Sequence, residues 1–395
     1  MLKIAVFLSQ TKQNGGGFQY ENSMCNILQK QGAEFEFNFF TINAKTQQDF
    51  AQYGINVILI TYNYLEKIFH KIARTNIGNR ILRKLNLHYH KIDQVIFANS
   101  IDLVYFLSPN GLCSHLSRTN YIMTVWDLCH RDFVEFPEIR ENNEFVSRET
   151  FYSTYLKQAV QVISDSVLGK ENIRKRYGID ESRITIIPFI PTEPCKQLQF
   201  IDIKKKYNIS GEYIYYPAQF WAHKNHIYIL DAIKILKEEH NIIINAVFSG
   251  SDKGNLEYIL NKAKSYDIDN QINYIGFVED VELPNLYQQS LALVMPTYFG
   301  PTNLPPLEAF SLGCPVFYSD LPGLREQVGE AGFLLDLNNP VSLVDNLLSI
   351  KQDRSLVHHK IQIGKNIIAN LAHENIIPIL KSIFTKYATK RRLWQ

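Results

Sequence analysis

Two charged residues, Lys224 and Glu308, lie where a charge needs a physical reason. Lys224 stands in "YYPAQFWAHKNHIYILDAIKIL", directly after an apolar run and at the start of a strongly periodic helix. A cation in the first turn of a helix opposes the helix dipole, which costs a few tenths of a kcal/mol. A bound phosphate would offset that cost, whereas a solvated surface lysine is the alternative. We therefore predict that Lys224 contacts an anionic ligand.

Glu308 belongs to "FGPTNLPPLEAFSLGCPV", in which two prolines stand at or next to the first position of a predicted helix. Asn303 is a suitable N-cap residue, and Glu308 can then be a capping-box glutamate bonded back to the backbone. The alternative is a ligand site, in which free amides near Asn303 and Leu304 face a diphosphate and Glu308 accepts hydrogen bonds from ribose hydroxyls. One short segment would then bind both ends of a nucleotide.

Other candidate residues follow predicted strands. Gly16 and Gly17 come after the first strand and before a helix expected to begin near Phe18, an arrangement that lets backbone amides approach an anion. Gly250 ends a buried strand, and another strand ends at Gly276, which leaves Phe277 and Val278 exposed where they could hold a nucleobase. A tight turn or ordinary packing is the alternative in each case. The glycine spacing does not match the dinucleotide fingerprint, which disfavours a nicotinamide enzyme.

Short apolar runs alternate with helix-period segments along nearly the whole chain, which indicates βαβ units and parallel sheets. A proline-containing stretch without periodicity separates two such series. We expect an N-terminal α/β domain at 1–190, a linker at 191–200, a second α/β domain at 201–373 and a C-terminal helix at 374–395 that can cross back to the first domain. Ligands of such sheets bind beyond the carboxyl ends of strands, so the cleft between the domains is the expected working site.

Composition excludes several classes of protein. Hydrophobic residues make up 46% of the 395 residues and the formal net charge is +2, which gives no global attraction to nucleic acid. Five scattered cysteines lack the spacing of a zinc site or a disulfide framework, which favours a reducing cytoplasm. No stretch approaches the roughly 18 apolar residues of a membrane span. We expect a cytoplasmic protein without a metal site.

Residues 66–91 hold seven Lys or Arg and one acidic residue, with apolar residues at helical spacing. Such a surface suits an anionic membrane leaflet. Equally, the apolar stripes can pack inward and leave the charges solvated. The sequence does not decide between the two.

At this point a family resemblance becomes visible. The stretches "AQFWAHKN", "YIGFV", "FGPTNLPPLEAFSLGCPV" and "GLREQVGEAGFLLD" resemble, in order, the carboxyl half of glycosyltransferase family 4. The first domain is similar more loosely, through the glycine loop, "TVWDLCHRDFVEFPE" and "VISDS". The resemblance implies the GT-B fold, two Rossmann-like α/β/α domains facing a cleft, and retaining transfer from a nucleotide-sugar donor without a cofactor or metal.

The resemblance also implies residue roles. Lys224 corresponds to the lysine that neutralises the donor diphosphate, and Glu308 to the second glutamate of a paired-glutamate motif, on the ribose. Phe277 and Val278 match the turn that contacts the base, while the two glycines before the first helix match those near the phosphate. Asp127 matches the aspartate of a His-Asp pair.

Three positions depart from the family pattern. The first glutamate of the pair falls at Gly300, the usual arginine before the lysine at Gln219, and the usual histidine before Asp127 at Trp126. Either activity is lost or the contacts to the donor sugar are remade, and we expect the second.

The candidates for remade contacts lie close to the altered positions. Thr302 and Asn303 follow Gly300, and His130 lies near enough in sequence to Asp127 to supply a polar group in place of the lost histidine. The expected reaction is hexosyl transfer from a UDP- or GDP-sugar to a saccharide or lipid-linked saccharide, as in bacterial surface polysaccharide (lipopolysaccharide) synthesis. The protein would work in the cytoplasm, at the inner face of the membrane if 66–91 binds there. The rival hypothesis is a non-catalytic nucleotide-sugar or glycan-binding protein.

Overall fold

The computed structural model describes residues 1–31, 34–63, 66, 78, 91–190, 199–371 and 373–394, and the chain divides into two compact units. The first unit comprises Met1–Leu128, Val146–Pro188 and His373–Gln395, and the second comprises Cys129–Phe145 and Phe189–Ala372. This grouping differs from the expected domain 1–190 at residues 129–145, whose contacts are made with the second unit. Nearly all of the expected linker, 191–200, and of the basic segment 66–91 lies outside the described residues.

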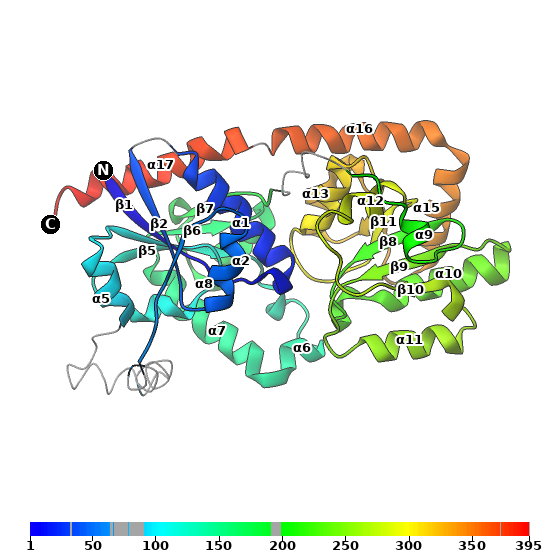
Figure 1. Ribbon diagram of the computed structural model, residues 1–395, viewed down its shortest axis with the longest axis horizontal. Helices are drawn as coiled ribbons and strands as arrows, with labels where there is room; N and C mark the ends of the chain where they lie inside the picture. The colour runs from blue at the N-terminus through cyan, green and yellow to red at the C-terminus, as the bar shows by residue number, and fades with distance from the viewer. Residues whose placement is uncertain are drawn as a thin grey trace. The chain divides into compact units, whose positions relative to one another are not determined.

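The first unit is built on a seven-stranded parallel sheet in the order β3-β2-β1-β4-β5-β6-β7 (Figure 1). Its strands are β1 Leu2–Phe7, β2 Phe35–Thr41, β3 Val57–Leu59, β4 Leu103–Phe106, β5 Asn120–Val125, β6 Gln161–Ser164 and β7 Ile184–Ile186. Its helices are α1 Gly16–Gln29, α2 Ala44–Ala51, α5 Lys91–Ala98, α7 Glu144–Tyr155, α8 Val167–Tyr177 and α17 His373–Arg391. Every residue of β4 and β6 is buried, as expected for a parallel sheet covered on both faces.

The second unit repeats this design with six parallel strands in the order β10-β9-β8-β11-β12-β13. Its strands are β8 Tyr213–Pro217, β9 Asn245–Ser249, β10 Ile272–Tyr274, β11 Leu293–Met295, β12 Val316–Ser319 and β13 Phe333–Leu335. Its helices are α6 Pro137–Arg140, α9 Ile203–Lys206, α10 His226–His240, α11 Leu256–Ser265, α12 Leu283–Gln288, α13 Leu304–Ser311, α14 Pro322–Val328, α15 Val341–Gln352 and α16 Arg354–Asn370. Helices α10 and α11 lie on one face of the sheet and α12 and α13 on the other (Figure 1).

Both sheets contain a point where the strand order reverses. In the first unit it lies between β1 and β4, and in the second between β8 and β11. The loops that leave two such neighbouring strands diverge to opposite faces of the sheet, and ligands of open parallel sheets bind in the crevice so formed. The fold therefore places two candidate crevices, one at the carboxyl end of each sheet.

The C-terminal helix α17 packs on the first unit. Phe384 is fully buried, and its ring meets Phe35 and Phe37 of β2 and Tyr105 of β4 at centroid distances of 5.4, 5.6 and 6.4 Å. The hydroxyl of Tyr387 donates to the carbonyl of Asp102 at 2.9 Å. The chain thus returns to the first sheet after completing the second unit. Among the described residues, no helix combines the length and apolar character needed to cross a bilayer.

Helix α13 packs closely against α16 at a glycine, Gly364. A Cβ built on Gly364 would lie 2.4 Å from Cδ1 of the buried Phe310 ring. Only a residue without a side chain lets the two helices approach this closely. Because α13 carries Glu308, the contact fixes a candidate site residue from behind.

We predict that Gly364→Ala lowers the free energy of unfolding by about 1–3 kcal/mol, because overpacking outweighs the gain in helix propensity. Chemical denaturation of the whole chain measures this. His359→Ala, at an exposed position of α16, is the control and should change stability little. Equal stability of the Gly364→Ala variant and the wild type would contradict the packing argument.

Candidate functional site at the carboxyl end of the second sheet

Lys224 lies just beyond β8, in the short 3-10 helix η7 (Ala222–Lys224). Asn225 follows in the left-handed conformation, at φ 55°, and α10 begins only at His226. The prediction that Lys224 stands in the first turn of the periodic helix is therefore wrong, and the dipole cost does not arise. The backbone is fixed on both sides, because Lys224 N donates to Trp221 O at 3.1 Å and Tyr216 Oη donates to Lys224 O at 2.9 Å.

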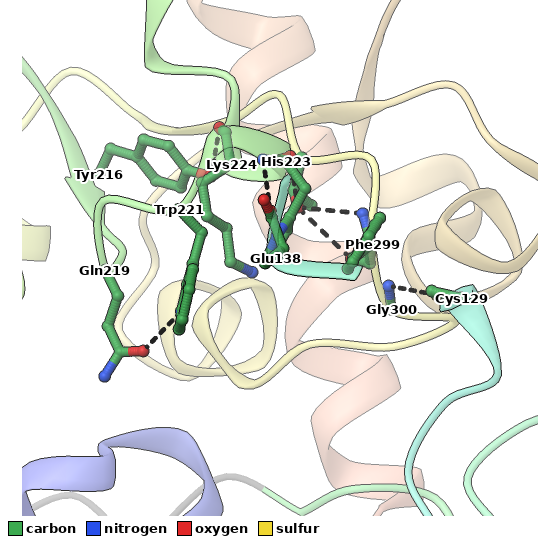
Figure 2. Close-up of polar contacts among 10 residues, drawn as sticks. Cys129, Glu138, Tyr216, Gln219, Trp221, His223, Lys224, Phe299 and Gly300 are labelled. Carbon is green, nitrogen blue, oxygen red and sulfur yellow. Dashed lines mark hydrogen bonds and ion pairs between the residues drawn. The ribbon is translucent and has the colours of Figure 1, made fainter. Parts of the chain in front are cut away.

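His223 joins the loop after β8 to the loop after β11. Its carbonyl accepts from Tyr298 N at 2.9 Å and from the Thr297 hydroxyl at 3.4 Å. Its ring stacks on Phe299 with a centroid distance of 4.0 Å and an interplanar angle of 9°. Figure 2 shows His223 and Phe299 beside the Lys224 side chain. Lys224 is thereby placed at the β8/β11 switch point.

A segment from between β5 and α7 also contacts these loops. Glu138 Oε1 accepts from His223 N at 3.0 Å and contacts His223 Nδ1. Burial opposes ionisation of Glu138, but the hydrogen bonds from the side chain and backbone of His223 prevail and lower its pKa. The rings of Phe133 and Phe136 pack on Phe299 at 5.8 and 5.3 Å.

Gly300 has a backbone shape that other residues adopt at a cost. Its φ is +93°, and a Cβ there would lie 2.9 Å from both Thr302 O and Asn303 Nδ2. Its amide donates to Cys129 Sγ at 3.2 Å. The loop is therefore shaped for glycine at the position where the resemblance led us to expect glutamate.

Asn303 occupies the N-cap position of α13, but its side chain makes no capping hydrogen bond. Instead, Asn303 Nδ2 donates to Tyr318 Oη at 2.6 Å. Its backbone amide donates to Gln327 Oε1 at 2.9 Å, and Gln327 Nε2 donates to its carbonyl at 2.6 Å. The expectation of a free amide at Asn303 is therefore wrong. Leu304 is buried at the first helical position.

Glu308 lies in the second turn of α13, too far from the N-cap for the expected capping box. Its Oε2 accepts from Tyr287 Oη at 2.7 Å. Within the described part of the chain, no hydrogen bond is seen to Oε1, which leaves an acceptor of the kind a ribose hydroxyl requires. Burial raises the pKa of Glu308 to about 7 and the charge of Asp280 adds to this, while the Tyr287 hydrogen bond opposes it.

The predicted strand-end residues fall into packed and exposed groups. Gly250 has a φ of +138°, and a Cβ there would lie 2.4 Å from Ala218 O, so it serves close packing of the β8 and β9 loops. Val278 packs against the core of the second unit. Phe277 is 53% exposed and remains available to a ligand at the end of β10.

Gln219 also has an internal partner. Its Oε1 accepts from Trp221 Nε1 at 3.0 Å, as Figure 2 shows, and the Lys253 ammonium lies 5.7 Å from the Trp221 ring. A cation from the loop after β9 is therefore near Gln219, the position where the resemblance led us to expect arginine. Thr302 lies between Gly300 and Asn303 and is half-buried.

The glycine loop of the first unit precedes α1, which begins at Gly16, two residues earlier than expected. Gly15 takes the positive φ of the turn. A Cβ on Gly17 would lie 3.0 Å from Gln10 Oε1 and 3.1 Å from the Trp126 ring. Gly17 therefore permits close packing, and Gly16 is exposed at the helix start.

Glu21 was missed by sequence reasoning although it organises the first switch point. It is fully buried on α1 and accepts from the backbone of Ser9 and Gln10 at 3.0 and 3.1 Å and from Ser108 Oγ at 3.1 Å. Burial raises its pKa to about 7 against the lowering effect of these hydrogen bonds. Its neighbours in sequence include the polar residues Gln19, Asn22 and Ser23, so the local pattern does not mark Glu21 as buried.

Asp127 and His130 fall into different units. Asp127 Oδ1 accepts from Arg148 Nη2 at 2.6 Å in the first unit. His130 belongs to the segment of the second unit, is fully buried, and its ring packs against Phe145 at 5.7 Å. This burial favours a packing role for His130 over the expected role of a polar group in place of the lost histidine. Across the described residues, no cluster of three or more His, Cys, Asp or Glu side chains could hold a metal ion.

We predict that Gly300→Glu does not restore a family contact but lowers the free energy of unfolding by about 1–3 kcal/mol. The backbone conformation and the Cβ clash are the cause, so Gly300→Ala should cost about as much. Denaturant unfolding of both variants measures the effect. A fully stable Gly300→Glu variant would show that the loop accepts a side chain.

A second prediction concerns pH. Because the pKa of Glu308 is about 7 in the folded chain and 4.5 for an ordinary glutamate, the folded state binds more protons there between these values. Stability contributed through Glu308 therefore falls as the pH rises from about 4.5 to 7. Glu308→Gln keeps an acceptor for Tyr287 but cannot titrate.

The measurement is the difference in melting temperature between wild type and Glu308→Gln at several pH values. The wild type should lose stability relative to the variant between pH 5 and 7. A difference that is the same at all these pH values would contradict the prediction.

Solved structures share this fold. A glycosyltransferase from Rickettsia africae superposes with a TM-score of 0.69 over 98% of both chains, at 15% identity. Anabaena Alr3699/HepE, solved in complex with UDP-glucose, gives a TM-score of 0.70 over 99% of this chain and all of that one, at 13% identity. At these identities the likeness establishes the fold, which is the expected GT-B class with two Rossmann-like α/β/α domains.

Sequence relatives match about half of the chain. The O-antigen chain mannosyltransferase B of Escherichia coli is 29% identical over 226 residues, 55% of this chain and 58% of that protein. The O-antigen chain mannosyltransferase RfbU of Salmonella typhimurium is 24% identical over 200 residues, 50% of this chain and 52% of that protein. The chain thus spans little more than half the length of these relatives. Residues 199–367, less than half of the chain, match the model of the glycosyl transferases group 1, so this region is similar to that family.

Proposed function

We propose that the protein is a retaining glycosyltransferase that uses a UDP- or GDP-sugar donor. The observation that carries the proposal is the position of Lys224 at the β8/β11 switch point, with its backbone held by Tyr216 and its neighbour His223 held by the β11 loop. The positively charged Lys224 side chain at this position can neutralise the charge of a bound diphosphate. The family match over residues 199–367 supports the assignment.

In the proposed reaction the bond between the anomeric carbon and the diphosphate breaks while the acceptor oxygen bonds to that carbon. Negative charge grows on the departing diphosphate, and Lys224 stabilises it, which lowers the barrier. The acceptor proton passes to the leaving phosphate, so no strong protein base and no metal is needed. Glu308, through Oε1, accepts hydrogen bonds from the ribose, and the exposed Phe277 contacts the base.

The acceptor we propose is a saccharide or lipid-linked saccharide of bacterial surface polysaccharide synthesis. One relative supports this class: an Escherichia coli UDP-Gal:alpha-D-GlcNAc-diphosphoundecaprenol alpha-1,3-galactosyltransferase, 28% identical over 163 residues, 38% of this chain and 41% of that protein. We further propose that the reaction takes place in the cytoplasm, with the basic segment 66–91 at the inner membrane face.

Lys224→Ala should reduce turnover by at least roughly 100-fold with the fold intact, since the positive charge that stabilises the leaving diphosphate is lost. Purified protein is incubated with UDP- and GDP-sugars and candidate acceptors, and free nucleoside diphosphate is measured. Lys264→Ala, an exposed lysine of α11, is the control and should keep the wild-type rate. A near-normal rate for Lys224→Ala would remove this lysine from the site.

The rival function, a non-catalytic nucleotide-sugar or glycan-binding protein, is favoured by the glycine-specific shape of the loop at Gly300. The same assay separates the two. Tight binding of a nucleotide sugar by the wild type, without release of nucleoside diphosphate under any acceptor condition, would establish the rival.

A further inference from the structure

The segment Cys129–Phe145 lies between β5 and α7 in sequence but contacts the second unit. Within that unit it meets both loops of the β8/β11 switch point. Cys129 Sγ accepts from Gly300 N in the β11 loop, and Glu138 accepts from His223 N in the β8 loop. A stretch outside residues 199–367, the region that carries the family match, therefore helps to build the candidate site.

Among the polar contacts of this segment, the one between Glu138 and His223 involves the residue that directly precedes Lys224 in the chain. One carboxylate oxygen, Oε1, meets both the backbone amide and the ring Nδ1 of His223. The side chains of Glu138 and His223 are 10% and 11% exposed. A carboxylate so enclosed is a stronger acceptor than a neutral group, because hydrogen bonds to an ionised partner are roughly twice as strong.

His223 transmits this contact in two directions. Toward the β11 loop, its carbonyl accepts from Tyr298 N and its ring stacks on Phe299. Toward the ligand, it is the residue before Lys224 in η7, whose carbonyl is held by Tyr216. Rotation of His223 would therefore shift the ammonium and the β11 loop together (Figure 2).

We infer that Glu138 is a positioning residue for the proposed transfer: by holding His223 it fixes Lys224 and the Thr297–Gly300 loop in the arrangement that receives the donor diphosphate. The inference rests on the proposed function, although the clamp itself is a structural claim. Glu138 touches no reacting atom and acts through His223.

The first test is structural and needs no substrate. Glu138→Leu removes the acceptor, and amide hydrogen exchange followed by mass spectrometry should become faster in peptides covering residues 220–226 and 296–303. Glu138→Gln keeps an uncharged acceptor and should give a smaller increase. Glu141→Leu, at an exposed position of the same segment, is the matched control. Unchanged exchange in Glu138→Leu would overturn the clamp.

The second test is a double-mutant cycle with Lys224→Ala. Glu138→Leu should lower kcat/KM by about 10- to 100-fold in the wild-type background and much less in the Lys224→Ala background, because the lysine through which it acts is gone. A purely structural defect would lower activity equally in both backgrounds and would refute the positioning role. Glu138→Gln, with intermediate activity, serves if Glu138→Leu does not fold.

The two hypotheses fail in different ways. If the wild type releases no nucleoside diphosphate from any UDP- or GDP-sugar, the proposed function fails. Affinity for UDP and GDP, measured by calorimetry, then tests the clamp alone, and weaker binding in Glu138→Leu but not in Glu141→Leu supports it. Equal affinity in all three proteins would overturn it.

Discussion

The candidate site depends on the contacts that the main-chain carbonyl and the ring of His223 make. The β8/β11 switch point sends its two loops to opposite faces of the sheet, so nothing in the sheet itself holds them together. His223 does this through Tyr298, Thr297 and Phe299. The ring stack excludes water and the hydrogen bonds fix orientation, and both are needed because a ligand charge is stabilised only by groups that are already in place.

The two sheets solve the same problem with different groups. In the first unit the buried carboxylate of Glu21 ties the β1 loop to the β4 loop through Ser9, Gln10 and Ser108. In the second unit a backbone carbonyl and an aromatic ring take that part. A buried carboxylate carries a desolvation cost that the ring stack avoids, and this cost is visible in the raised pKa of Glu21. Hydrogen bonds to a buried carboxylate therefore hold the loops at the switch point of the first unit, whereas ring packing contributes more in the second unit.

The sequence predicted well what depends on local pattern and poorly what depends on distant contacts. Apolar periodicity gave both parallel sheets and the position of Lys224 after β8, because period and composition decide element type. It could not show that Gln327 occupies the amide of Asn303, since 24 residues separate them. Nor could it show that residues 129–145 join the second unit. Asn225 separates Lys224 from the first turn of α10. Its left-handed conformation does not alter the apolar periodicity, so the sequence pattern could not reveal this interruption.

These distant contacts change what the β11 loop can offer a ligand. The amides of Gly300 and Asn303 and the side-chain amide of Asn303 all donate within the chain. Because residue 300 is glycine, a donor sugar finds no glutamate there. It cannot bind these amides instead, because each new contact would break an existing hydrogen bond. In the proposed reaction the recognition therefore moves to two groups outside this loop: the Lys224 ammonium for the diphosphate and Glu308 Oε1 for the ribose. Gly300 and the internal hydrogen bonds of the loop therefore make it rigid. They do not provide hydrogen-bond donors for the ligand.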